Sequence, residues 1–347
     1  MVGAALACSV LFVSAGCIWL MLRFAHRIPV TDIPNERSSH TRPTLRTGGV
    51  AIVLSFVLGL CVALWMGLAG RGMLQAVLLP GILVFFLGLA DDAFRLGEAI
   101  KLALQVLIAV GTVLLGGVVL RSIDVPGLGE VGLGALAVPL TIVWVVGMVN
   151  VYNFMDGLDG LVGGVGVIAA GWLLLLFSLH GAPELGLVSL LLGTGIAGFL
   201  LFNFPPAKIF MGDSGSSFAG FLFAILAIVG AQAPSPGIPF PVFLLLFGAF
   251  LADTSVTLVR RMMRGEPWYK AHRSHFYQRV TNLGFSHRDV SVIEYVLAFI
   301  QGLLGVAYLW LDSAGRVAVL AFWAVALGLL ILSVHRREAQ ARLAVQG

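Results

Sequence analysis

Five aspartates in three short polar segments are the residues best suited to chemistry. Asp91 and Asp92 are adjacent, Asp156 and Asp159 share a second segment, and Asp213 stands in a third. A single aspartate at the end of an apolar helix is commonly a solvated cap. Five of them favour a Mg²⁺ site, because one or two carboxylates together with substrate phosphates are sufficient to hold this ion. Mn²⁺ suits the same oxygen ligands.

Glycines and hydroxyl groups surround the third of these aspartates. The segment from Phe210 to Ser217 reads F-M-G-D-S-G-S-S and leads directly into an apolar run. Such a turn can offer backbone N–H groups and a helix N-terminus to a phosphate, although small residues there are also ordinary helix caps. Beside a metal-binding carboxylate, the segment predicts a phosphate site.

The longest polar segment, residues 260 to 289, is rich in basic residues and contains His272, Arg273 and His275. Attraction to anionic lipid headgroups is one interpretation. Zinc is another, but it needs two further ligands and the three cysteines lie in apolar runs elsewhere. We favour phosphate recognition by the two histidines and Arg273. Asp253 precedes this segment inside an apolar run, where it is either functional or paired with a basic residue.

The elements that must position these residues are membrane helices. Of 347 residues, 59% are hydrophobic and 11% are charged, and the mean hydropathy is +1.01. A helix needs roughly 20 apolar residues to cross a bilayer. The sequence therefore predicts an all-α integral membrane protein, forming one domain over residues 1–347 with about eleven spans. The predicted spans are 3–22, 50–69, 73–90, 102–120, 131–149, 161–179, 185–201, 214–233, 238–259, 290–311 and 317–334.

The basic residues predict the orientation of these spans. Segments on one side hold 18 of the 21 lysines and arginines, and the other side holds Arg71, Arg121 and Arg316. Cytoplasmic segments are the basic ones, so the N-terminus is expected outside and the C-terminus inside. All three aspartate segments then face the cytoplasm. The net charge of +4 reflects this membrane topology, and no nucleic-acid partner is expected.

Taken in order, the motifs resemble those of the polyprenyl-phosphate N-acetylhexosamine-1-phosphate transferase family, over roughly residues 34 to 290. The stretch from Asn150 to Leu161 resembles the family's N-x-x-N-x-x-D-G-L-D-G-L almost letter for letter. The stretch from Asn203 to Ser216 resembles its N-x-x-P-A-x-x-F-M-G-D-x-G-S segment. Three shorter matches are the first loop with Arg42 and the glycines 48 and 49, the Asp91–Asp92 pair, and the basic residues Arg95 and Lys101.

The resemblance implies a bacterial inner-membrane enzyme, with its site at the cytoplasmic face, that joins a UDP-N-acetylhexosamine to undecaprenyl phosphate. Membrane lipid and a second copy of the chain, as a homodimer, are the other partners it implies. Mg²⁺ would lie on Asp213, together with Asp156 or a member of the aspartate pair. Asp91, Asp92 and Asp213 would be catalytic, and uracil would contact Asp159, Asn203 and Phe210. The other implied substrate-binding residues are Asn150, Asn153, Asp156, Lys101, Arg42, His272, Arg273 and His275.

One departure from the family concerns the donor sugar. Muramoyl-pentapeptide transferases carry a histidine triplet where this chain has His272, Arg273, Ser274 and His275. The pattern is more similar to O-antigen initiating transferases, so the expected donor is a 6-deoxy-N-acetylhexosamine, with muramoyl-pentapeptide as the alternative. A transporter is the alternative from another class, but it predicts ionisable groups and broken helices near the midplane. A membrane scaffold gives no reason for the aspartates.

Overall fold

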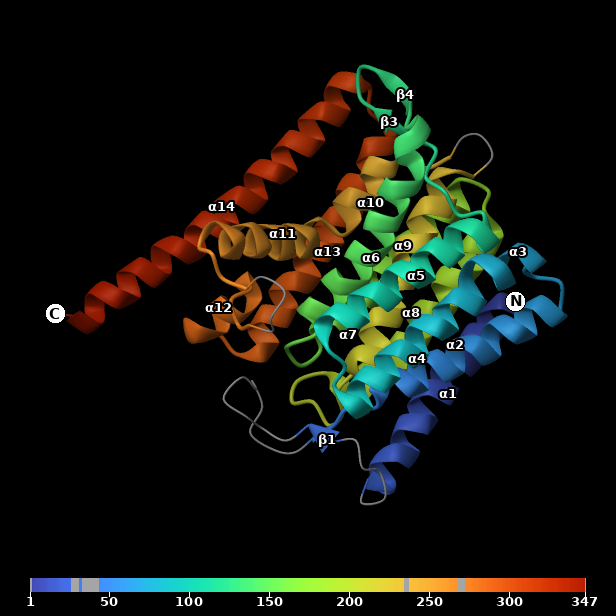
Figure 1. The fold of residues 1–347 in the computed structure, drawn as a ribbon, viewed down its shortest axis with the longest axis horizontal. Coiled ribbons are helices and arrows are strands. Elements are labelled where there is room, and N and C mark those ends of the chain that lie inside the picture. The colour runs from blue at the N-terminus through green and yellow to red at the C-terminus, as the bar shows by residue number, and fades with distance from the viewer. Residues whose placement is uncertain (1, 26–30, 33–43, 234–236, 268–271, 347) are drawn as a thin grey trace.

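Almost all of the protein is helical (Figure 1). The computed structural model describes residues 2–25, 31–32, 44–233, 237–267 and 272–346. Within these residues, ten helices are long and apolar enough to cross a membrane, which confirms the all-α polytopic prediction. They are α1 (Val2–Arg23), α2 (Gly48–Trp65), the continuous α3, η2 and α4 (Arg71–Met73, Leu74–Leu78, Leu79–Phe94), α5 (Glu98–Gly116), α6 (Ala137–Met155, preceded by the turn η3, Gly134–Leu136), α7 (Leu161–Leu179), α8 (Pro183–Asn203), α9 (Gly212–Ala231), α13 (His287–Trp310) and α14 (Ser313–Gln346).

The predicted span 238–259 is not one straight helix. It is divided into α10 (Phe240–Leu246) and α11 (Gly248–Met263), which bend by 76° from each other and together make an eleventh span at most. In Figure 1, α11 runs across the flank of the bundle. The reason lies in its composition, because Asp253, Arg260 and Arg261 would be costly if α11 continued through hydrocarbon.

The two predicted spans around residue 120 are also displaced. Helix α5 ends at Gly116, and Gly117 has a left-handed φ of 65°, which suits glycine at a helix end. The chain then forms an antiparallel hairpin of β3 (Ser122–Val125) and β4 (Gly129–Gly132), so the predicted helix start at Val131 falls in a strand. Residues 121–130 were expected only to connect two spans, and the apolar run that begins at Val131 is long enough to predict a helix from its first residue.

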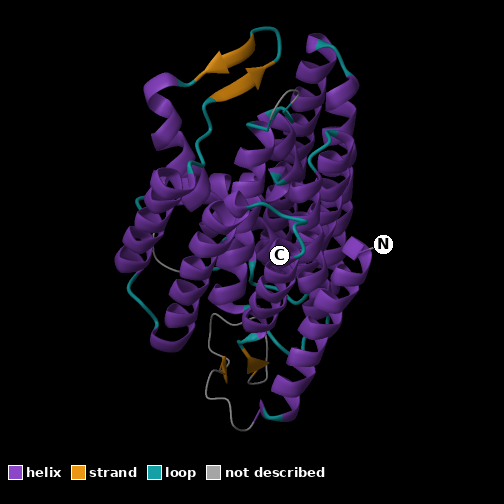
Figure 2. Cartoon of the chain, turned by 90° about the vertical axis from the view of Figure 1, so that its right-hand side faces the viewer, coloured by secondary structure: helices purple, strands orange, loops and turns teal. Residues whose placement is uncertain are grey.

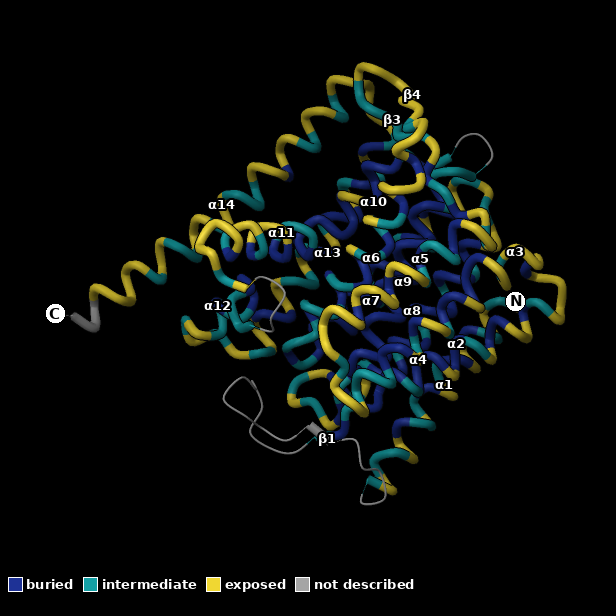
Figure 3. The backbone as a smooth tube through the Cα atoms, in the orientation of Figure 1, coloured by how far each residue is buried: buried dark blue, intermediate teal, exposed yellow. Residues whose placement is uncertain are grey.

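Helix α9 forms the centre of the bundle, with 89% of its spanning residues buried against neighbours that include α2, α4 and α6 (Figure 3). Glycines permit the closest contacts. A Cβ at Gly88 of α4 would meet the backbone of Asp213, so the glycine lets the end of α4 reach the start of α9. In contrast, only 6% of the α14 span is buried, and this helix leaves the bundle.

The two ends of the bundle differ in what they carry. Figure 2 shows the β3–β4 hairpin at one end and the short strands β1 (Thr31–Asp32) and β2 (Thr44–Leu45), an antiparallel pair, at the other. The three aspartate segments and the short helix α12 (Phe276–Asn282) lie toward the β1–β2 end. The basic-residue distribution predicts that this end faces the cytoplasm.

This orientation predicts the outcome of cysteine labelling. In a variant with Cys8, Cys17 and Cys61 replaced by serine, a cysteine at position 121 should react with an impermeant maleimide added to intact cells. A cysteine at position 264 should react only after the membrane is opened, although Arg264 is exposed in the fold. Labelling of position 264 but not 121 in intact cells would invert the topology.

Candidate active site

Two aspartates from two helices meet a buried lysine at the end of the bundle. Asp91 lies in the last turn of α4 and Asp213 in the first turn of α9. Lys101 of α5 donates to both, with its Nζ 2.9 Å from Asp91 Oδ2 and in close contact with Asp213 Oδ2. Lys101 is itself buried, so these carboxylates take the place of water around its charge. The predicted residues Asp91, Asp213 and Lys101 are therefore one cluster.

Adjacent residues of the aspartate pair have different surroundings. Asp92 accepts from the backbone N–H groups of Asp213 at 2.9 Å and Ser214 at 3.0 Å, so both of its oxygens cap the start of α9. Its side chain is 1% exposed, whereas that of Asp91 is 16% exposed. Asp92 therefore holds α4 and α9 together, and Asp91 is the accessible member of the pair.

Arg46 completes the cluster, and the sequence analysis missed it. It follows β2, and its guanidinium lies 3.2 Å from Asp92 Oδ1 and 2.5 Å from Asp213 Oδ1. Gly48 and Gly49 just beyond it donate their N–H groups to Phe210 and Met211, which fixes this segment beside α9. The sequence signal was its place between the predicted Arg42 and the glycine pair. Arg42 itself lies outside the described residues.

The second aspartate segment follows α6 and borders the cluster. Asn153 donates to Ser216 of α9 at 3.1 Å, and Asn150 donates to Gln105 of α5 at 2.7 Å, so both asparagines join helices. The carboxylate of Asp156 has no hydrogen bond to another residue that the structure describes. The pKa of Asp156 is raised to about 7, mainly by burial, with smaller contributions from the carboxylates of Asp213 and Asp92 and an opposing one from Arg46.

The three residues predicted to contact uracil lie farther along the same end. Asn203 is buried and uses both ends of its amide, accepting from Gly160 N at 2.9 Å and donating to Ile209 O at 2.8 Å. Asp159 accepts from Ala207 N at 3.0 Å. Phe210 is half-buried. Asn203 and Asp159 thus join the second and third segments, and contact with uracil stays a prediction for all three residues.

Asp253 holds the basic segment in place. Its carboxylate accepts from His275 Nδ1 at 2.9 Å and from the N–H groups of Phe276 and Tyr277 at 3.0 Å, the first residues of α12. Tyr277 in turn donates from its hydroxyl to Phe154 O at 2.9 Å. The bend after α10 therefore places Asp253 where it fixes α12 against the end of α6. Of its two interpretations from sequence, the pairing with a basic side chain is the observed one.

The three predicted phosphate-binding residues of this segment differ in their hydrogen bonds and in their charge. His275 is buried and its Nδ1 is taken by Asp253. His272 lies 4.8 Å from His275, measured between ring centroids. The pKa of His272 is lowered to about 4, mainly by burial and in part by the nearby His275 and Arg261, so its imidazole is neutral at pH 7. Arg273 keeps a fixed charge, which makes it the better anion-binding residue of the three.

Comparison with known proteins identifies the family of this chain. The model for glycosyl transferase family 4 matches residues 74–231, which include Asp91, Lys101 and Asp213. The chain is 31% identical to a Bacillus subtilis protein named probable undecaprenyl-phosphate N-acetylglucosaminyl 1-phosphate transferase, over 84% of this chain and 82% of that protein. The chain belongs to the polyprenyl-phosphate N-acetylhexosamine-1-phosphate transferase family.

Two further relatives carry similar names. A decaprenyl-phosphate N-acetylglucosaminephosphotransferase of Mycobacterium tuberculosis is 31% identical over 78% of this chain and 74% of its own length. An undecaprenyl-phosphate alpha-N-acetylglucosaminyl 1-phosphate transferase of Yersinia pestis is 25% identical over 84% of this chain and 80% of its own. These matches confirm the family predicted from the motifs and identify this multi-pass membrane protein as a sugar-1-phosphate transferase.

The transferase has a donor set that fits a divalent cation supplied together with a diphosphate. No group of three or more acidic, histidine or cysteine side chains suited to a metal occurs in the described part of the chain. Mg²⁺ does not require one, since it retains waters and takes phosphate oxygens. Asp213 and the unbonded carboxylate of Asp156 are oxygen donors of the right kind, although Lys101 and Arg46 now occupy Asp213.

Proposed function

We propose that this transferase moves an N-acetylhexosamine 1-phosphate from a UDP-sugar to a polyprenyl phosphate, undecaprenyl phosphate in bacteria. The observation that carries the proposal is the Asp91–Asp213–Lys101–Arg46 cluster, which combines carboxylates and cations at one end of the membrane helices. The names of the relatives support both substrates. We place the cluster at the cytoplasmic face of the inner membrane, where the basic residues favour it.

In the proposed reaction an oxygen of the polyprenyl phosphate attacks the phosphorus that bears the sugar. A new P–O bond forms, the P–O bond to the uridine phosphate breaks, and UMP leaves with the electron pair. The products are polyprenyl-diphospho-sugar and UMP. Phosphoryl transfer of this kind needs positioning and charge neutralisation more than covalent help from the protein.

Lys101 and Arg46 provide the positive charge that such a reaction requires. Each is held between two carboxylates, so both are oriented before the substrates arrive. We assign Asp91 to accept the remaining proton of the polyprenyl phosphate or to orient it, because Asp91 is more exposed than the capping residue Asp92. Mg²⁺ on Asp213 and Asp156, when bound, would neutralise diphosphate charge.

The proposal also concerns which N-acetylhexosamine the UDP-sugar carries. The sequence around His272 and His275 favoured a 6-deoxy-N-acetylhexosamine, and an O-antigen as the eventual product. The relatives are named for N-acetylglucosamine. Both sugars share the N-acetyl group and the UDP portion, so the cluster serves either of them. In both cases the transferase would start the synthesis of a cell-surface polysaccharide.

A donor panel tests the proposal directly. Purified protein is incubated with undecaprenyl phosphate, Mg²⁺ and one UDP-sugar, and UMP and the lipid product are measured together. We expect turnover with UDP-N-acetylglucosamine or its 6-deoxy relatives, at least about 10²-fold above the rate with UDP-muramoyl-pentapeptide, a ratio within reach of pocket discrimination. Omitting Mg²⁺ should abolish it. Faster turnover of the muramoyl donor, or release of UMP without lipid product, would contradict the assignment.

A further inference from the structure

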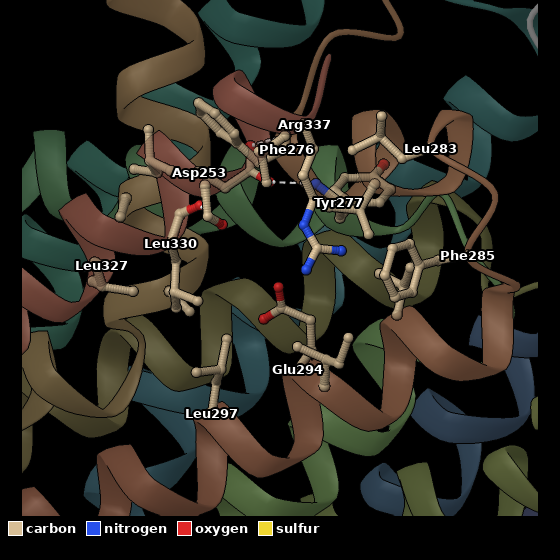
Figure 4. A pocket seen from close by; sticks show the side chains of 18 residues that line it. Asp253, Phe276, Tyr277, Leu283, Phe285, Glu294, Leu297, Leu327, Leu330 and Arg337 are labelled. Carbon is tan, nitrogen blue, oxygen red and sulfur yellow. Dashed lines mark hydrogen bonds between the residues drawn. The ribbon is translucent and has the colours of Figure 1, made fainter. Parts of the chain in front are cut away.

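A cavity of about 300 Å³ lies beside the described site, between α11, α12, α13 and α14 (Figure 4). Its walls are mainly apolar, with Leu283, Phe285, Leu297, Leu327 and Leu330 among them. This volume is at the lower end of the range for ligand pockets. Since α14 is almost uncovered by protein, membrane lipid has access to the cavity from its side.

A carboxyl group and a guanidinium line this cavity. Figure 4 shows the carboxylate of Glu294 from α13 and the guanidinium of Arg337 from α14 directed toward each other. They form no ion pair or hydrogen bond within the described part of the chain, and Glu294 Oε2 is buried with no hydrogen-bond partner there. Glu294 as a whole is half-buried, and Arg337 is exposed at the cavity mouth with its guanidinium 5.8 Å from the centre of the Phe285 ring. A carboxylate oxygen buried without a partner is costly, so a donor group from a bound ligand would stabilise it.

The charges define what such a ligand must carry. A cationic group suits Glu294, and an anionic group suits Arg337. The leucine and phenylalanine walls between them suit hydrocarbon. We propose that the cavity binds a zwitterionic phospholipid, with its ammonium group on Glu294, its phosphate on Arg337 and an acyl chain along α13 and α14.

The cavity also contacts the residues that hold the basic segment. Asp253, Phe276 and Tyr277 form one of its walls. Arg279 of α12 bonds Glu338 of α14 through two nitrogens, at 2.7 and 2.5 Å. A lipid between α13 and α14 therefore sets the position of α14 and, through Arg279, that of α12. An effect of this lipid on turnover would rest on the proposed function, whereas binding of the lipid does not.

The test measures lipid binding without turnover. Protein stripped of lipid is titrated with phosphatidylethanolamine, or with phosphatidylglycerol of the same chains, and bound lipid is counted by native mass spectrometry. The ethanolamine lipid should bind about tenfold more tightly, the value of one charge-assisted hydrogen bond. Glu294→Gln should abolish this preference, and Arg337→Gln should weaken both lipids. Arg342→Gln, the same charge change on an exposed part of α14, should bind as the parent does.

Other outcomes would overturn the site. These are equal binding of the two lipids, retention of the preference in Glu294→Gln, binding of neither lipid, and displacement of the ethanolamine lipid by polyprenyl phosphate, which would make the cavity part of the acceptor site. Leu327→Trp fills the cavity and leaves both charges, so it should lose the lipid even if a charge variant fails to fold. Lack of transferase activity would leave every binding result intact.

Discussion

Replacing Asp213 with asparagine is expected to lower turnover by about 10²-fold to 10³-fold, the usual loss when a strong electrostatic contact to developing charge is removed. Asparagine keeps the size of the side chain but has no negative charge. Lys101 and Arg46 would then lose the carboxylate at which they converge, and a cation would lose its main protein oxygen. The measurement is UMP release at saturating substrates over a series of Mg²⁺ concentrations.

The matched control is Asp124→Asn. Asp124 of β3 also pairs with an arginine, Arg316, at 3.2 Å, but at the opposite end of the bundle. This variant should turn over at the parent rate, and both variants should insert into the membrane and melt near the parent temperature. If Asp213→Asn kept near-parent turnover with the same Mg²⁺ dependence, the carboxylate would be only a part of the helix terminus.

Asp253→Ala should have its main effect on the stability of α12. It removes the acceptor of three groups at the start of α12, His275 Nδ1 and the N–H groups of Phe276 and Tyr277. Breaking a buried pair of this kind costs about 3 kcal/mol, so local opening should become about 10²-fold more frequent. Hydrogen exchange over residues 275–282 measures this directly. Turnover should fall as well, because the basic segment loses its anchor, but by less than in Asp213→Asn.

Two further substitutions serve as comparisons for the hydrogen exchange of Asp253→Ala. Asp253→Asn keeps one acceptor oxygen and should show an intermediate increase in exchange. Thr257→Val removes only the 3.2 Å bond from the threonine hydroxyl to Asp253, on the same face of α11, and should exchange like the parent. Unchanged exchange in Asp253→Ala would mean that α12 is held by Tyr277 and by the Arg279–Glu338 pair instead.

The comparison of Asp91 with Asp92 has a simple structural cause. Successive residues of a helix point about 100° apart, so one member of an adjacent pair can face a neighbouring helix while the other faces an open end. Here α9 begins beside Asp92 and takes both of its oxygens. Asp91 turns toward Lys101 instead. Asp91 Oδ1 also accepts from Leu96 N at 2.9 Å, so the two aspartates differ in exposure, with Asp92 buried against α9 and Asp91 16% exposed.

The sequence by itself determined the fold class, the number and approximate place of the spans, the family and the polar segments of the site. These features depend on short stretches of chain. A run of about 20 apolar residues spans a bilayer whatever surrounds it. The N-x-x-N-x-x-D-G-L-D-G-L stretch is likewise complete within twelve residues. The aspartates could be recognised as functional candidates because carboxylates are rare among such runs.

Only the tertiary structure decided the partners of these residues. Arg46 and Lys101 are 55 positions apart and meet at Asp213, more than 100 positions farther along the chain. Asp253 meets the start of α12 across more than 20 positions of chain, and the cavity beside Glu294 and Arg337 exists because α13 and α14 leave space between them. Each of these contacts is a consequence of packing between distant segments. Hydropathy and local motifs carry no information about which distant side chains come into contact.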